Sequence, residues 1–135
     1  MRAVMLLVAL LIGCVAPLHA ADDVAAAQSA IRSQVEALQR DDAATAYSYA
    51  APALQRMFRD PDTFMGMVRS GYAPVVRHKS FEFGEGHAAD GQIVQHVDIV
   101  DADGAVWDAL YTLAPQPDGS LKITGCTLVK AGQAV

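Results

Sequence analysis

Residues 90–119, DGQIVQHVDIVDADGAVWDALYTLAPQPDG, indicate the architecture of this chain. Apolar residues alternate with polar ones, and three Asp-Gly pairs interrupt them, at 90–91, 103–104 and 118–119. Asp-Gly is favoured in tight β-hairpin turns because both positions tolerate a positive φ. Extended to both sides, the pattern predicts a four-stranded antiparallel meander with strands near residues 80–86, 92–100, 105–113 and 120–129.

The predicted sheet is apolar on both faces. The strand at 105–113 directs Val106 and Leu110 to one side, and to the other it directs Trp107, Ala109, Tyr111 and Leu113. One face must cover the helices, and a second apolar face usually has a cover as well. We therefore expect a homodimer that forms through the outer face of the sheet.

Helical spacing precedes the strands. Asp22 and Asp23 suit a helix start, and residues 40–42 separate this helix from a second one that Pro52 ends. Residues 52–57 fit a further helical turn. Asp60 then caps another helix with Pro61 at its first position, and Gly71 fits the left-handed residue after its end. Three N-terminal helices packed on a curved four-stranded meander give an α+β fold.

The chain has 135 residues and a formal net charge of −5, with acidic and basic residues scattered. This length suits one domain, which we place at residues 21–135. Nucleic-acid binding requires clustered Lys and Arg. The one basic cluster, at residues 77–79, is expected to be a solvated strand edge. We expect no nucleic-acid partner.

The first twenty residues read as a signal peptide. Arg2 precedes an apolar run at 4–16, and Ala20 is a small residue suited to the cleavage site. The alternative is a lipoprotein, because residues 11–14, Leu-Ile-Gly-Cys, resemble a lipobox in which Cys14 is lipidated. The expected location is periplasmic or secreted, with a lipid anchor to a bacterial membrane only if Cys14 is modified.

Cleavage after Ala20 would leave Cys126 as the sole cysteine, which excludes an intramolecular disulfide. We expect Cys126 to be a buried, small apolar residue, since free cysteines are among the most buried residue types. The alternative, a reactive thiol, requires a lowered pKa.

Helices followed by a curved meander resemble the cone-shaped fold of the nuclear-transport-factor-2-like superfamily. More closely, residues 24–130 resemble a bacterial family of exported proteins known only as domain of unknown function 4864. The resemblance rests on RDDAA (40–44), YSYA (47–50), FMGMV (64–68), GYAPV (71–75), FGE (83–85), LY (110–111), DGS (118–120) and ITGC (123–126). One departure is Leu121, where such proteins often have Trp. The resemblance implies the fold and export, and it implies no activity.

The cone-shaped superfamily builds pockets between its helices and its sheet. The aromatic residues that could line such a pocket are Tyr47, Tyr72, Trp107 and Tyr111. Aromatic residues also dominate ordinary cores, so the alternative is plain packing. A pocket of this kind would take a small apolar ligand.

His96 and Asp98 are the only candidates for catalysis. They are two apart in a predicted strand, so they share a face and form a potential carboxylate-oriented general base. An exposed strand edge explains the pair equally well. No histidine spacing indicates zinc, and residues 101–104 lack the downstream glutamate of a calcium loop. We expect no metal and no cofactor.

These observations favour a non-enzymatic domain that binds a small ligand or another protein. The alternatives are an enzyme with an isomerase-like or hydrolase-like pocket that uses His96 and Asp98, and a membrane-anchored lipoprotein.

Overall fold

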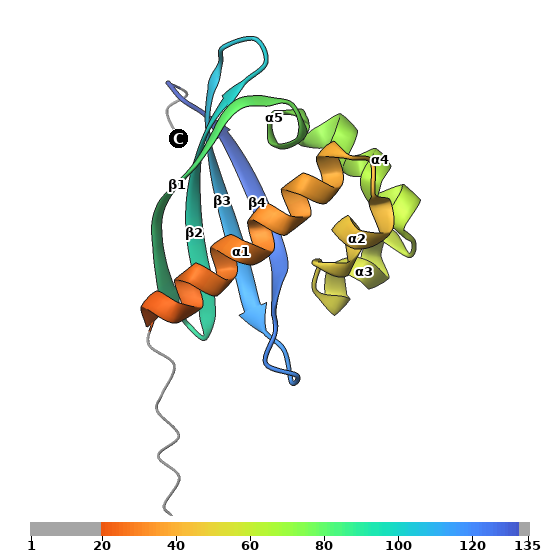
Figure 1. The fold of residues 1–135 in the computed structure, drawn as a ribbon, viewed down its shortest axis with the longest axis vertical. Coiled ribbons are helices and arrows are strands. Elements are labelled where there is room, and N and C mark those ends of the chain that lie inside the picture. The colour runs from red at the N-terminus through yellow and green to blue at the C-terminus, as the bar shows by residue number, and fades with distance from the viewer. Residues whose placement is uncertain (1–19, 133–135) are drawn as a thin grey trace, which may run out of the picture.

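The structure, a computed structural model, describes residues 20–132. The predicted leader and Cys14 lie outside the described residues. The second half of the chain forms a four-stranded antiparallel sheet with the order β1-β2-β3-β4 (Figure 1). Its strands are β1 (His78–Ala89), β2 (Gln92–Asp101), β3 (Val106–Pro115) and β4 (Leu121–Lys130). The predicted meander is confirmed, and β1 is longer at both ends than predicted.

The three Asp-Gly turns differ in geometry. Asp90 and Gly91 both have a positive φ, 50° and 75°, as a two-residue hairpin requires. In the other two turns only the glycine is left-handed, with a φ of 85° at both Gly104 and Gly119. Both of these turns are longer; in the first, the Gly104 N–H donates to the Asp101 carbonyl at 3.1 Å. A positive φ at both positions therefore holds only for the first turn.

An irregularity in β1 bends the sheet. The register with β2 shifts between Phe83 and Gly86, which leaves the carbonyls of the bulged residues without regular partners. Gln95, fully buried on β2, donates from its Nε2 to the carbonyls of Gly84 at 3.1 Å and Glu85 at 3.3 Å. Its Oε1 accepts from Gln28 Nε2 at 3.1 Å. The Gln95 amide thus donates hydrogen bonds to the carbonyls of the bulge and links the bulge to α1.

Five helices precede the sheet in the described part of the chain, where we expected three and one further turn. They are α1 (Ala20–Gln39), α2 (Ala43–Ser48), α3 (Pro52–Phe58), α4 (Pro61–Gly71) and α5 (Ala73–Val76). Asp42 and Asp60 cap α2 and α4 by accepting from Thr45 N and Thr63 N at 3.2 and 2.8 Å. No helix in this part of the chain has the length and apolar character needed to cross a bilayer.

One turn around these helices differs from the prediction, and another contains a left-handed residue that was not predicted. Gly71 is the last residue of α4 and is not among the residues with positive φ, so its expected left-handed role is wrong. The reason is α5, which starts at Ala73 and leaves only Tyr72 between the two helices. Asp41, between α1 and α2, has a left-handed φ of 59° instead.

Helix α1 runs diagonally across the concave face of the sheet and supplies much of the core (Figure 1). Its apolar stripe, Ala27, Ile31, Val35 and Leu38, is buried at helical spacing. It packs on the inner sheet residues Ile93, Val97, Ile99, Ala109, Tyr111, Leu113 and Ile123. Full burial of an Ile or Leu side chain stabilises a fold by about 1.5–3 kcal/mol. The alternation in β3 therefore separated the two faces of the sheet correctly, and the structure shows that Ala109, Tyr111 and Leu113 are on the inner one.

Candidate ligand-binding site

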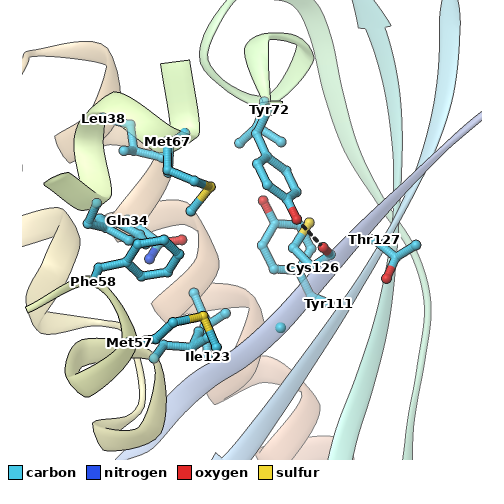
Figure 2. A pocket seen from close by; sticks show the side chains of 15 residues that line it. Gln34, Leu38, Met57, Phe58, Met67, Tyr72, Tyr111, Ile123, Cys126 and Thr127 are labelled. Atoms are coloured by element: carbon cyan, nitrogen blue, oxygen red, sulfur yellow. Dashed lines mark hydrogen bonds between the residues drawn. The ribbon is translucent and has the colours of Figure 1, made fainter. Parts of the chain in front are cut away.

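A cavity of about 310 Å³ lies between the helices and the sheet. Helix α1 passes behind it, α3 and α4 form one side, and β3 and β4 form the other (Figure 2). Its lining is predominantly apolar and aromatic: Gln34, Leu38, Leu54, Met57, Phe58, Phe64, Met67, Val68, Tyr72, Val75, Tyr111, Ile123, Gly125, Cys126 and Thr127. Ligand pockets in proteins typically combine such a lining with a few polar groups.

The cavity exists because α4 is held away from the sheet. Helix α4 packs mainly on α2, α3 and α5. Its stripe of Phe64 and Val68 is buried, and Met67 extends into the cavity. The α2–α3 connection is fixed to β4 by two backbone hydrogen bonds, Ala51 N to the Ile123 carbonyl at 2.8 Å and Ile123 N to the Tyr49 carbonyl at 2.9 Å. These attachments keep α4 so far from the sheet that the side chains between them do not fill the space.

Gln34 places an amide group in this apolar cavity. It lies on α1 between Ile31 and Leu38, and only 5% of the residue is exposed. Its Nε2 donates to the carbonyl of Ala46 at 3.1 Å, which anchors the side chain to α2. In Figure 2 the amide lies beside Phe58 and is directed into the cavity. Gln34 thus gives the cavity a fixed polar point.

Tyr72, Tyr111 and Cys126 form a second polar group on the sheet side. The Tyr72 hydroxyl donates to the Cys126 carbonyl at 2.9 Å (Figure 2). Burial raises the pKa of Cys126 to about 12, an effect that hydrogen bonding to Tyr111 partly offsets. Burial also raises the pKa of Tyr111 well above its usual range, and that of Tyr72.

The cavity is therefore electrically neutral at physiological pH. Among the described residues that line it, none is Asp, Glu, His, Lys or Arg. The groups that can ionise, the two phenols and the thiol, remain protonated because their pKa values are raised. Cys126 is partly buried, where we expected a buried residue. Its raised pKa disfavours the thiolate, which is the nucleophilic form.

The structure separates the four aromatic residues that the sequence singled out. Tyr72 and Tyr111 both line the cavity. Tyr47 packs on Phe64 with ring centroids 5.7 Å apart, and its hydroxyl donates to the Gln55 carbonyl outside the cavity. Trp107 lies near the start of β3 and does not line the cavity; its indole N–H donates to Asp101 Oδ2 at 2.9 Å.

His96 and Asp98 share a face of β2, as their spacing predicted, but this is the outer face of the sheet. Neither residue lines the cavity. The carboxylate nearest the imidazole is that of Asp108 on β3, with His96 Nδ1 and Asp108 Oδ1 3.3 Å apart. Both side chains are substantially exposed to solvent. The described residues also include no group of three His, Cys, Asp or Glu that could hold a metal.

Sequence reasoning missed Gln34 and the methionine and phenylalanine side chains from α3 and α4. The missed residues that give the cavity its character are Gln34, Met57, Phe58, Phe64 and Met67. A signal for Gln34 was present, because a polar residue stands within an apolar stripe at helical spacing. A buried polar residue at such a position is more informative than another aromatic one.

A sequence model of the family described as domain of unknown function (DUF4864) matches residues 20–134. The chain belongs to this family. A solved structure, described as an NTF-2-like protein of unknown function from Silicibacter pomeroyi DSS-3, is similar in fold. The two share 19% identity with a TM-score of 0.52, over 82% of this chain and 97% of that chain. The comparison with curated proteins gives no match. This member of DUF4864 thus has an NTF-2-like α+β fold, as its sequence predicted.

Proposed function

We propose that this domain binds a small, uncharged, predominantly apolar molecule in the cavity between its helices and its sheet. The observation that carries the proposal is an apolar cavity of about 310 Å³ with the buried amide of Gln34 on its wall. An engineered apolar cavity of roughly 150 Å³ accommodates benzene. The cavity of this domain is about twice as large, which suits a molecule of about two to three aromatic rings or an equivalent chain.

The lining favours binding over catalysis. General acid–base chemistry requires a group that exchanges protons near the working pH. The ionisable groups of the cavity instead have raised pKa values, and Cys126 is at about 12. His96 and Asp98, the candidate base and its partner, lie on the opposite side of the sheet. An enzyme that used them would need a substrate bound on that outer face.

Binding is tested with N-phenyl-1-naphthylamine, an uncharged probe whose fluorescence rises in apolar surroundings. We expect saturable binding by the wild-type domain and loss of binding in Met67→Trp, whose indole fills the cavity from α4. Ser70→Trp is the matched control, because Ser70 is exposed on the same helix and does not line the cavity. Equal binding by the two variants, or no saturable binding by the wild type, would contradict the proposal.

We also propose that the domain works outside the cytoplasm, in the periplasm or as a secreted protein. Support comes from the sequence of residues 1–20, with cleavage after Ala20 as the main expectation and lipidation of Cys14 as the alternative. Intact-mass measurement of the protein recovered from an expressing bacterium distinguishes the two. A mass that matches the full chain in the cytoplasm would contradict export.

We further propose that two copies associate through the outer face of the sheet. Two of the exposed large hydrophobic residues, Val106 at 49% and Val129 at 36%, lie on this face. Glu82, Asp98 and Asp108 form an acidic row across it, since they are register partners on neighbouring strands. Like charges repel, and salt screens them. We therefore expect light scattering to show a dimer that tightens as salt is raised. A monomer at all salt concentrations would refute it.

A further inference from the structure

The oxygen of the Gln34 amide faces the cavity without a protein partner. The Nε2 atom must face Ala46, because its partner there is a carbonyl, which accepts a hydrogen bond and cannot donate one. This fixes the orientation of the amide and turns Oε1 away from Ala46. No residue that the structure describes donates to this oxygen, although Gln34 is only 5% exposed.

Other polar side chains of the protein interior have partners within the protein. The Tyr72 hydroxyl donates to the Cys126 carbonyl, and Tyr111 is next to the Cys126 thiol. Gln95, the other buried glutamine, uses its Oε1 to accept from Gln28. The contrast between the two glutamines singles out Gln34: its Oε1 has no donor among the described residues, and because no buried side-chain oxygen of these residues lacks a partner, this atom must be accessible to a ligand or to water.

We infer that the ligand of this cavity is an uncharged molecule that carries a hydroxyl group, and that Gln34 selects it by accepting a hydrogen bond from that hydroxyl at Oε1. This inference rests on the proposed binding function. The apolar walls favour the apolar body of such a molecule, while Oε1 favours a group that donates a hydrogen bond to it. Water can meet this preference in the empty cavity. A hydroxyl that displaces the water keeps the hydrogen bond, whereas a methyl ether loses it.

A carboxylate is the wrong head group for this cavity. It would bring a negative charge toward an acceptor oxygen, and no Lys or Arg is among the lining residues to compensate. Transfer of an unpaired charge from water into an apolar site is strongly unfavourable. Discrimination between a neutral hydroxyl and a carboxylate on the same body is therefore part of the inference.

The test compares four probes on one aromatic body: naphthalene, 2-naphthol, 2-methoxynaphthalene and 2-naphthoate. Binding is measured by displacement of N-phenyl-1-naphthylamine. For the wild type we expect 2-naphthol to bind about fivefold to tenfold more tightly than 2-methoxynaphthalene, as one added hydrogen bond allows. We expect 2-naphthoate to bind at least about tenfold more weakly than 2-naphthol.

The residue assignment is tested with Gln34→Leu. Its preference for 2-naphthol over the ether should fall to within about twofold, because the accepting oxygen is gone. Gln39→Leu is the matched control, since Gln39 lies on the same helix, is exposed and should leave the preference intact. Gln34→Met replaces Gln34→Leu if the leucine variant does not fold.

The outcomes separate the two proposals. If naphthalene binds the wild type but 2-naphthol has no advantage over the ether, the hydroxyl inference is wrong and the binding function stands. If the advantage persists in Gln34→Leu, Gln34 is not the selecting residue. If none of the four probes binds, both the inference and the proposed function fail.

Discussion

The two sides of the cavity are built very differently. On the sheet side, Val97, Ile99 and Leu113 are fully buried and belong to strands bonded along their length. On the helix side, α3 contains no buried residue, and Met57 is 68% exposed although it lines the cavity. Regions with few buried contacts open at a lower free-energy cost than the core. The comparison indicates that the sheet sets the shape of the cavity and that α3 is the side that opens more readily.

The ends of α3 also favour opening on this side of the cavity. Its N-terminal end is attached to β4 through Ala51, whereas its C-terminal end passes into Arg59, which has a left-handed φ of 73°. In the middle, Gln55 Nε2 donates to the Tyr47 carbonyl at 3.0 Å, and the Gln55 carbonyl accepts from the Tyr47 hydroxyl. Helix α3 is thus held at its start, by one pair of polar contacts and by its packing on α4, which includes Phe58 on Phe64. An opening motion would need to break few interactions.

The largest expected difference between the two sides is in their response to the loss of a leucine. Leu113→Ala should lower the free energy of unfolding by about 2–5 kcal/mol, because Leu113 is fully buried and leaves a cavity. Leu54→Ala, in α3, should lower it by less than about 1 kcal/mol, since its side chain already faces an open space. Urea denaturation measures both. Similar losses of unfolding free energy in the two variants would contradict the difference between the sheet side and the helix side.

Two glycines test the bulge that curves the sheet. A Cβ at Gly86 would lie 2.3 Å from Gln95 Oε1 and 2.7 Å from Val24 Cγ1, whereas at Gly84 its nearest contact is at 3.5 Å. Gly86→Ala should therefore lower the unfolding free energy by about 1–3 kcal/mol, because overpacking forces neighbours to move. Gly84→Ala should have a much smaller effect. Equal thermal stability of the two variants would show that Gln95 does not hold the bulge rigidly.

Alkaline pH should act on the sheet side. The pKa of Cys126 is raised to about 12 in the folded protein, above its unfolded value of about 8.5. The fold therefore favours the neutral thiol, and its stability is intact below about pH 8.5 and declines as the pH rises toward 12. Cys126→Val removes this group and should shift alkaline unfolding to higher pH, as followed by circular dichroism. An unchanged midpoint would contradict the burial of the thiol.

The smallest effect should be in local opening. Amide hydrogens of α3 should exchange at least about tenfold faster than those in the buried half of α1, which corresponds to an opening free energy about 1.4 kcal/mol lower. Hydrogen exchange followed by mass spectrometry measures the difference. A bound probe should slow exchange in α3 more than in β2. Uniform protection of both helices would contradict easier opening at α3.

Much of the fold followed from local rules. Asp-Gly turns, the caps at Asp42 and Asp60 and the alternation of β3 depend on a few neighbouring residues, so the sequence contains them. The expected pairing of β2 with β3 also indicates on which face of the sheet His96 and Asp98 lie. Asp98 pairs with Asp108 and His96 with Leu110, so both candidates share the face opposite Tyr111. The pairing across the 101–105 turn would have placed them outside the cavity.

The cavity itself did not follow from local rules. Its volume depends on the separation of α4 from the sheet, which is set by contacts between α4, α2 and α5 and by the attachment at Ile123. Tyr47 and Trp107 have the same residue character as Tyr72 and Tyr111, and only the tertiary arrangement separates them. Gln34 is the exception, because its position in the stripe of α1 made it unusual before the structure was known.

The bridge between Ala50 and Ile123 has a consequence for how the protein is made. The two residues are far apart in the chain, and contacts between distant segments slow folding. The helices come first along the chain, and the segment that anchors α3, around Ile123, is among the last to emerge. The apolar sides of α3 and α4 therefore stay exposed to solvent, and prone to aggregation, until β4 has emerged and can pack against them. A chain that stops before Leu121 would lack the β4 wall of its cavity and the attachment at Ile123 that holds the start of α3.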